Sequence, residues 1–142
     1  MEVSDVRRRL RGAIEDAKRR VTERRRRVDE ASRDYERFLT DVATPAFHMM
    51  AQALIGEGLR FKVHTPGQAV RLAPDRTTED YIELALDSER DVPAVVARTI
   101  RGRGRRMIST ERPIREGKRI SELTDEDVIE TLLEELLPFV ER

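Results

Sequence analysis

Two histidines and a group of carboxylates near the C-terminus are the side chains whose types suit acid–base or metal chemistry. His48 and His64 are the only histidines, and neither stands beside a serine, lysine or carboxylate at the spacing of a known catalytic motif. A metal site would need carboxylate ligands that the sequence does not identify. We therefore expect both histidines to be packed or surface residues, with no metal bound.

The carboxylates cluster between residues 125 and 135. Acid–base catalysis would require a pocket that perturbs the pKa of one of them, and the sequence indicates no such pocket. Acids at the start of a helix are instead explained by solvation and by their favourable interaction with the helix dipole. We therefore expect no catalytic site among Asp125, Glu126, Asp127, Glu130, Glu134 and Glu135.

Several functions are disfavoured by missing residues or motifs. The chain has no cysteine, which excludes disulfides, thiolate metal sites and cysteine nucleophiles, and this is compatible with a cytosolic location. The sequence contains no nucleophile constellation and no phosphate-binding loop. Its apolar runs fall short of the roughly 18 residues that a membrane span requires. We therefore expect a cytoplasmic protein that is not an enzyme, binds no cofactor and has no membrane segment.

A basic segment, residues 98–106, is the most unusual local feature. We expect this segment to form two strands joined by a tip with Gly102 and Gly104, which is a hairpin that presents the arginines of the segment. Such a hairpin suits phosphates, because arginine makes bidentate contacts, but the segment has no aromatic residue for base stacking. The alternative is a surface that faces the acidic helix of residues 122–135 or another acidic protein. The residues predicted to bind an acidic ligand or nucleic acid are Arg98, Arg101, Arg103, Arg105 and Arg106.

Charge is segregated along the chain, although the formal net charge is zero. The net charge is +3 over residues 1–41, −3 over residues 42–93, +7 over residues 94–119 and −7 over residues 120–142. This segregation favours pairing of unlike regions, within one chain or between chains, over a uniform nucleic-acid-binding surface.

The first 42 residues carry a heptad pattern typical of a coiled coil. From Val3 onward, at spacings of alternately four and three residues, ten of twelve positions are apolar or aromatic. A helix of about 40 residues is about 60 Å long, about twice the width of so small a head, so this seam needs another helix. The predicted oligomer interface comprises Leu10, Ile14, Ala17, Val21, Arg24, Val28, Ala31, Tyr35, Phe38 and Val42.

An antiparallel homodimer is the predicted form of the stalk. A parallel pair would set Arg20 against Arg25 of the partner, with no opposite charge to offset the repulsion. An antiparallel pair centred near Ala31 would instead set Arg20 opposite Asp41 and Arg27 opposite Asp34. Such exposed ion pairs select an alignment more than they stabilise it.

Thr44 and Pro45 are expected to interrupt the long helix with a kink or a short break. Proline lacks the amide donor and crowds the preceding turn, although Thr44 as N-cap would restart a helix cleanly. The apolar segment of residues 46–55 then packs on the core of the head. At the other end of the chain, a helix begins after Thr124 and is expected to kink or end before Pro138.

Between these helices the sequence alternates apolar and polar residues. This pattern predicts about five antiparallel strands between residues 59 and 110. Short connections give a meander sheet covered on one face by helices. The predicted fold class is α+β, with a coiled-coil stalk helix over residues 1–43 and a head over residues 44–142 that folds without the stalk.

Segregated charge and an unpartnered helix together favour a function in association. We expect a scaffold protein that oligomerises through its N-terminal helix and presents a charged head surface to an acidic protein partner. The alternative is a nucleic-acid-binding protein that uses the basic hairpin of residues 98–106.

Overall fold

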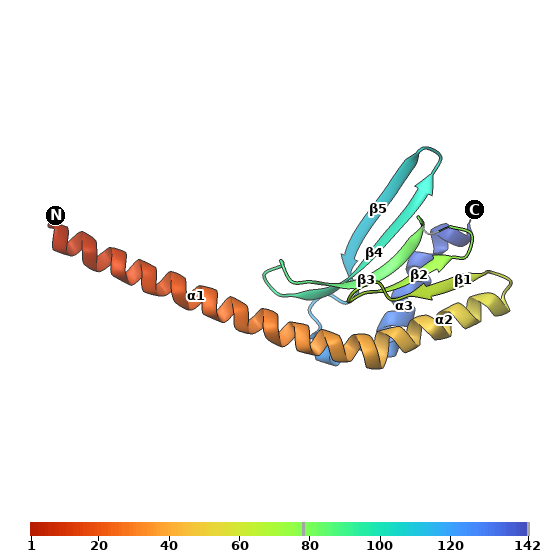
Figure 1. Ribbon diagram of the computed structural model, residues 1–142, viewed down its shortest axis with the longest axis horizontal. Helices are drawn as coiled ribbons and strands as arrows, with labels where there is room; N and C mark the ends of the chain where they lie inside the picture. The colour runs from red at the N-terminus through yellow and green to blue at the C-terminus, as the bar shows by residue number, and fades with distance from the viewer. Residues whose placement is uncertain (78, 142) are drawn as a thin grey trace.

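One long helix, a five-stranded antiparallel sheet and a C-terminal helix follow each other along the chain (Figure 1). The computed structural model describes residues 1–77 and 79–141. The α+β prediction is confirmed. The elements are α1 (Val3–Phe38), η1 (Leu39–Ala43), α2 (Thr44–Gly56), β1 (Phe61–His64), β2 (Val70–Pro74), β3 (Tyr81–Asp87), β4 (Ala94–Arg103), β5 (Arg106–Pro113), η2 (Ile120–Glu122) and α3 (Asp125–Val140).

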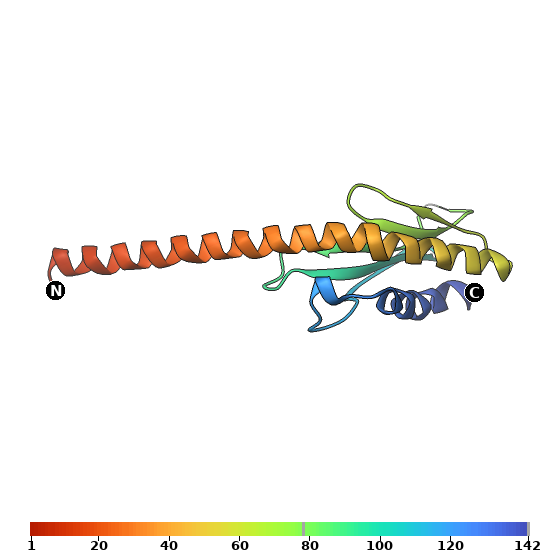
Figure 2. The ribbon, with the colours of Figure 1, turned by 90° about the horizontal axis from the view of Figure 1, so that it is seen from below.

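The sheet is a meander in which each strand pairs antiparallel with the next, in the order β1-β2-β3-β4-β5. Alternate residues of the strands point to one face, where Leu72, Leu84 and Val95 join the buried core. The helices α2 and α3 lie side by side over that face (Figure 2). The predicted arrangement of a meander covered on one face by helices is therefore confirmed.

The long helix passes through Thr44 and Pro45 without ending there. The backbone N–H of Thr44 donates to Leu39 O, five residues back, within the π-helical turn η1. A wider turn relieves the crowding that a proline imposes on the preceding carbonyl groups. Thr44 is helical and makes no cap, so, of the kink or short break expected here, the structure has a bend of a continuous helix (Figure 1).

The last third of α1 belongs to the core of the head. Ala31, Tyr35 and Phe38 are buried in the same hydrophobic cluster as the sheet and α3. The hydroxyl of Tyr35 donates to Gln68 O at 2.5 Å, which fixes the helix against the start of β2. The solvated part of the stalk therefore ends near residue 28, whereas the sequence placed the boundary at residue 43.

The C-terminal helix begins as predicted, and it does not end near Pro138, where the sequence predicts a kink or an end. Thr124 Oγ1 accepts from Asp127 N, and Asp127 Oδ2 accepts from Thr124 N, which is a reciprocal capping box. The helix continues past Pro138 to Val140. Proline removes one hydrogen bond near this end, and the last turn tolerates that loss because few bonds remain to be broken.

Two truncations are expected to locate the start of the folding unit. Deleting residues 1–22 removes exposed residues and should change the melting temperature of the head by less than about 3 °C. Deleting residues 1–41 also removes Ala31, Tyr35 and Phe38, and because truncating one buried aromatic side chain costs about 3–5 kcal/mol, it should abolish the cooperative transition. Calorimetry checks both; an unchanged transition after the longer deletion would show that the base of the helix is dispensable.

Tyr35→Phe is expected to destabilise the head and to change its response to alkali. Burial and the nearby charge of Glu83 raise the pKa of Tyr35, so the folded chain holds this proton more tightly than the unfolded chain. Its contribution is therefore complete below a pH of about 10 and is lost as the pH rises above that value. The variant should lose about 1–2 kcal/mol at pH 8 and less at higher pH. Denaturant titrations at pH 8 and above 10 measure both effects.

Candidate binding surfaces

The first surface is the free seam, which we define as the apolar seam positions of α1 from Val3 to Val21. Within it, Val3, Leu10, Ile14 and Val21 are 74%, 57%, 46% and 52% exposed. The helix projects away from the head over this length, about 28 Å for residues 3–21 (Figures 1 and 2). At Arg24 the head begins to approach the helix, where the guanidinium donates to Glu89 O at 3.3 Å.

Acidic and basic side chains are sorted around this helix. With Ile14 and Val21 as a positions, every acid of residues 2–30 occupies a b, c or f position, on the outer face. Four of these seven acids bind arginines of the same helix: Asp5 binds Arg8, Asp16 binds Arg19, and Glu23 and Glu30 bind Arg26.

The e and g positions beside the free seam contain no acid. Those that carry a charge are Arg11, Lys18, Arg20, Arg25 and Arg27. Among the residues that the structure describes, no ion pair or hydrogen bond satisfies these five side chains. The free seam is thus an apolar stripe with basic borders.

The predicted pairing centred near Ala31 is incompatible with this fold. Ala31, Tyr35 and Phe38, which it would place against a second helix, are buried within their own chain. Val42 is half-buried and packs against the same core, so these four predicted interface residues are structural. Of the predicted interface, Leu10, Ile14, Ala17 and Val21 remain open, with Arg24 and Val28 at the edge of the head.

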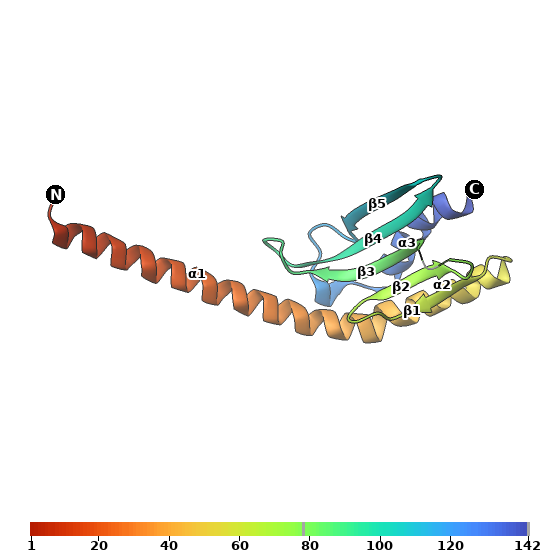
Figure 3. The ribbon, with the colours of Figure 1, turned by 45° about the horizontal axis from the view of Figure 1, so that its top comes forward.

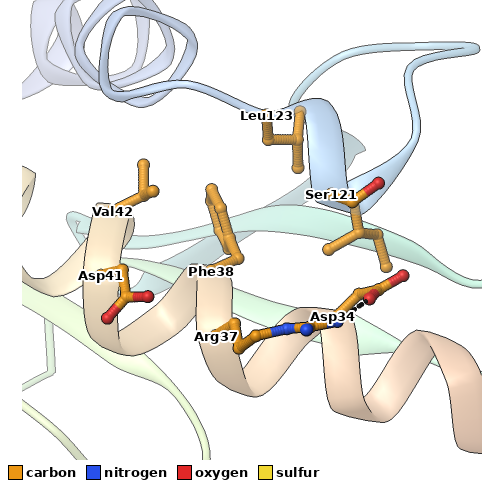
Figure 4. A pocket seen from close by; sticks show the side chains of 8 residues that line it. Asp34, Arg37, Phe38, Asp41, Val42, Ser121 and Leu123 are labelled. Carbon is orange, nitrogen blue, oxygen red and sulfur yellow. Dashed lines mark hydrogen bonds and ion pairs between the residues drawn. The ribbon is translucent and has the colours of Figure 1, made fainter.

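A groove of about 360 Å³ lies between the base of α1 and η2 (Figure 4). Its apolar lining includes Phe38 and Leu123, both part of the core, so the groove is a shallow surface feature over packed side chains. On its rim Arg37 binds Asp34 at 2.5 Å, and Asp41 lies beside them. These are the acids that were expected to attract a second stalk, and Asp34 is already bound by its own helix.

The second surface is the tip of the β4–β5 hairpin, residues 101–106. Strand β3 pairs with β4 only as far as Ile100, so the rest of the hairpin extends beyond its neighbour (Figure 1). Asp80 Oδ1 accepts from Gly102 N at 2.8 Å and holds the hairpin where the ladder ends. Gly104 has a φ of 63°, a left-handed conformation that glycine adopts without strain.

The arginines of the tip extend into solvent. Arg103, Arg105 and Arg106 are exposed and Arg101 is half-buried. Within residues 1–77 and 79–141, none of these four guanidinium groups makes an ion pair. They could therefore bind an anionic ligand without first breaking an internal contact.

Arg98 lies on strand β4 of the hairpin, as expected, and below the tip. The register places it in a row of directly paired residues that crosses all five strands, whose order Figure 3 shows. Arg98 Nε binds Glu111 at 3.1 Å, and on its other side the buried Glu83 accepts from Arg71 at 2.8 Å. The row is His64, Arg71, Glu83, Arg98 and Glu111.

Part of the segregated charge is neutralised inside the head. Arg112 of β5 binds Glu134 at 2.7 Å and Glu135 at 2.6 Å, so β5 pairs with α3 through a residue outside the basic segment of residues 98–106. Asp127 binds Arg115 and Lys118 at 3.1 Å and 2.6 Å. Burial by itself would raise the pKa of Asp127, but hydrogen bonds from Lys118 and Thr124 outweigh it and lower that pKa.

The remaining candidates for chemistry are dispersed. His48 and His64 are exposed and lie on α2 and β1. Among the described residues, no group of three or more histidines and carboxylates could hold a metal ion, and no helix is long and apolar enough to cross a membrane. Comparisons with protein-family models, with curated proteins and with solved structures found no match to this chain.

Replacing Arg101, Arg103, Arg105 and Arg106 together by glutamine should leave the fold nearly unchanged. Each exposed substitution is expected to change the free energy of unfolding by less than about 0.5 kcal/mol. Arg112→Gln is the matched control, because it loses hydrogen bonds to Glu134 and Glu135 and should cost about 1–2 kcal/mol. Thermal unfolding measures the stability of the two variants. A greater loss of stability in the fourfold variant than in Arg112→Gln would mean that the tip is part of the packed structure.

Proposed function

We propose that this protein is a non-enzymatic association module that self-associates through the free seam of its N-terminal helix. The observation that carries the proposal is the exposed apolar stripe of Val3, Leu10, Ile14 and Val21 on a helix that projects from the head. A stripe of this kind on an isolated helix is stabilised only when another surface covers it. The charged head would then be displayed at a defined distance from the contact.

The head supports a second binding role at the hairpin tip. Four arginines in six residues, exposed or half-buried and without internal acid partners in the described chain, favour an anionic ligand. A nucleic acid is the second candidate, because its phosphates suit guanidinium groups on a projecting hairpin. Affinity for a short duplex that falls steeply with salt would support this candidate. Binding of a defined acidic protein, with little affinity for the duplex, would favour the scaffold.

The seam is tested by a double substitution and its matched control. Ile14→Asn with Val21→Asn removes two apolar side chains from the free seam, whereas Glu15→Asn with Thr22→Asn makes the same change one residue later on the outer face. Each buried Ile or Val contributes about 1.5–3 kcal/mol, so the seam variant should dissociate at more than about a hundredfold higher concentration. The control should remain associated.

Mass measurement by light scattering over a range of concentrations is the readout. The melting temperature of the head should be the same in both variants, since residues 14, 15, 21 and 22 are exposed. A monomeric wild-type chain at micromolar concentration, or equal masses for the seam variant and its control, would contradict self-association through this seam.

A further inference from the structure

The solvent-facing side of α3 carries its own apolar stripe. Leu133, Leu137 and Val140 are 54%, 53% and 42% exposed, although they lie on a helix whose other side is fully buried in the core. Their spacings of four and three residues place them in one line along the helix. Three exposed large apolar side chains in line mark a surface that a second helix could cover.

Carboxylates border this stripe. Glu130 continues its line toward the start of α3, and Glu134 and Glu141 lie beside it, one residue after Leu133 and Val140. All three are exposed; Glu134 and Glu130 also bind Arg112 and Arg115 of their own chain at the edge of the sheet, whereas Glu141 makes no ion pair within the described residues. The charge of this border is therefore opposite to that of the free seam, whose borders are Arg11, Lys18, Arg20, Arg25 and Arg27.

The free seam cannot reach α3 of its own chain. The helix from Val3 to Gly56 is continuous, and α1 leads away from the head while α3 lies beside α2 at the other end (Figure 2). A contact between the two stripes therefore requires two chains.

We infer that the free seam of one chain docks antiparallel on α3 of a second copy. In one antiparallel register Val21 faces Leu133, Ala17 faces Leu137 and Ile14 faces Val140, each an a position against a d position. The same register sets Lys18 beside Glu134 and Arg11 beside Glu141, with Arg24 opposite Glu130. Two such contacts, one in each direction, would join a pair of chains about a twofold axis.

Pairing of two free seams gives no comparable match of charge. In an antiparallel pair of the seams, with Ile14 facing Ala17, Arg11 borders Lys18 of the other chain and Arg7 faces Arg24. A parallel pair sets Arg20 beside Arg25. Like charges at these positions disfavour both alignments, whereas α3 offers carboxylates at the matching places.

The inference rests on the proposed self-association, and crosslinking of full-length chains separates the two. Because the chain has no cysteine, single cysteines report one contact each. A chain with Val21→Cys is mixed with a differently tagged chain with Leu133→Cys under mild oxidation, and the mixed disulfide should be the main product. Arg19→Cys, on the outer face, replaces Val21→Cys in the control and should give at least about tenfold less.

Each result has one meaning. A dominant disulfide between two Val21→Cys chains, or between Val21→Cys and Leu10→Cys, would show seam-to-seam pairing: self-association would stand and docking on α3 would be overturned. A monomeric wild-type chain would overturn both.

Reversing the two charges of one proposed ion pair, Arg11 with Glu141, tests the register independently. Arg11→Glu and Glu141→Arg should each weaken association about threefold to tenfold, and the double variant should recover most of the loss. Neither residue makes an ion pair within the described chain, although Glu141 borders a groove with Arg101 and Arg103. Equal weakening in the single and double variants would overturn the register. Thermal unfolding checks that the head is intact in all three.

Discussion

A single apolar stripe on one unbroken helix must be covered along its length, and the head covers only its last part. Tyr35 and Phe38 are buried under the sheet, while Leu10 and Ile14 lie beyond the reach of the head. The same heptad spacing therefore serves two purposes, packing at the base and an open seam further out. The association that we propose follows from the part that the chain leaves uncovered.

The charged side chains also fall into two groups, those that are paired within the chain and those that are left open. Inside the head, Arg112 and Lys118 bind acids of α3, and the row through Glu83 satisfies Arg71 and Arg98 across the open face of the sheet. On the stalk, acids are paired on the outer face and the bases beside the seam are left without partners in the described chain. Internal pairing thus leaves a basic stalk, a basic hairpin tip and a partly acidic α3 as the surfaces available to ligands.

Strand alternation and the cap at Thr124 were sufficient to predict the sheet and the C-terminal helix, because both are local. The meander follows from period-two residues joined by short turns, and the Thr124 cap follows from the first turn of its helix. Ala31 and Tyr35 are buried by contacts of the tertiary structure. A heptad pattern cannot distinguish such residues from a seam shared with another chain. Arg98 was included among the ligand-binding arginines for a similar reason: only the register with Glu83 and Glu111 shows that it is paired.

Continuity through Pro45 determines what a contact on the stalk can do. A break with Thr44 as a cap would have let the head change its orientation relative to the stalk. The position of a partner on the stalk would then not determine the orientation of the head. The turn η1 keeps the helix continuous, and Phe38 and Phe47, on either side of it, are buried in one core. Because a rigid helix packed at its base transmits direction, a partner bound near Ile14 would fix the orientation of the head as well as its distance. The π-turn at the proline thereby keeps the stalk and the head in one relative orientation, instead of joining them flexibly.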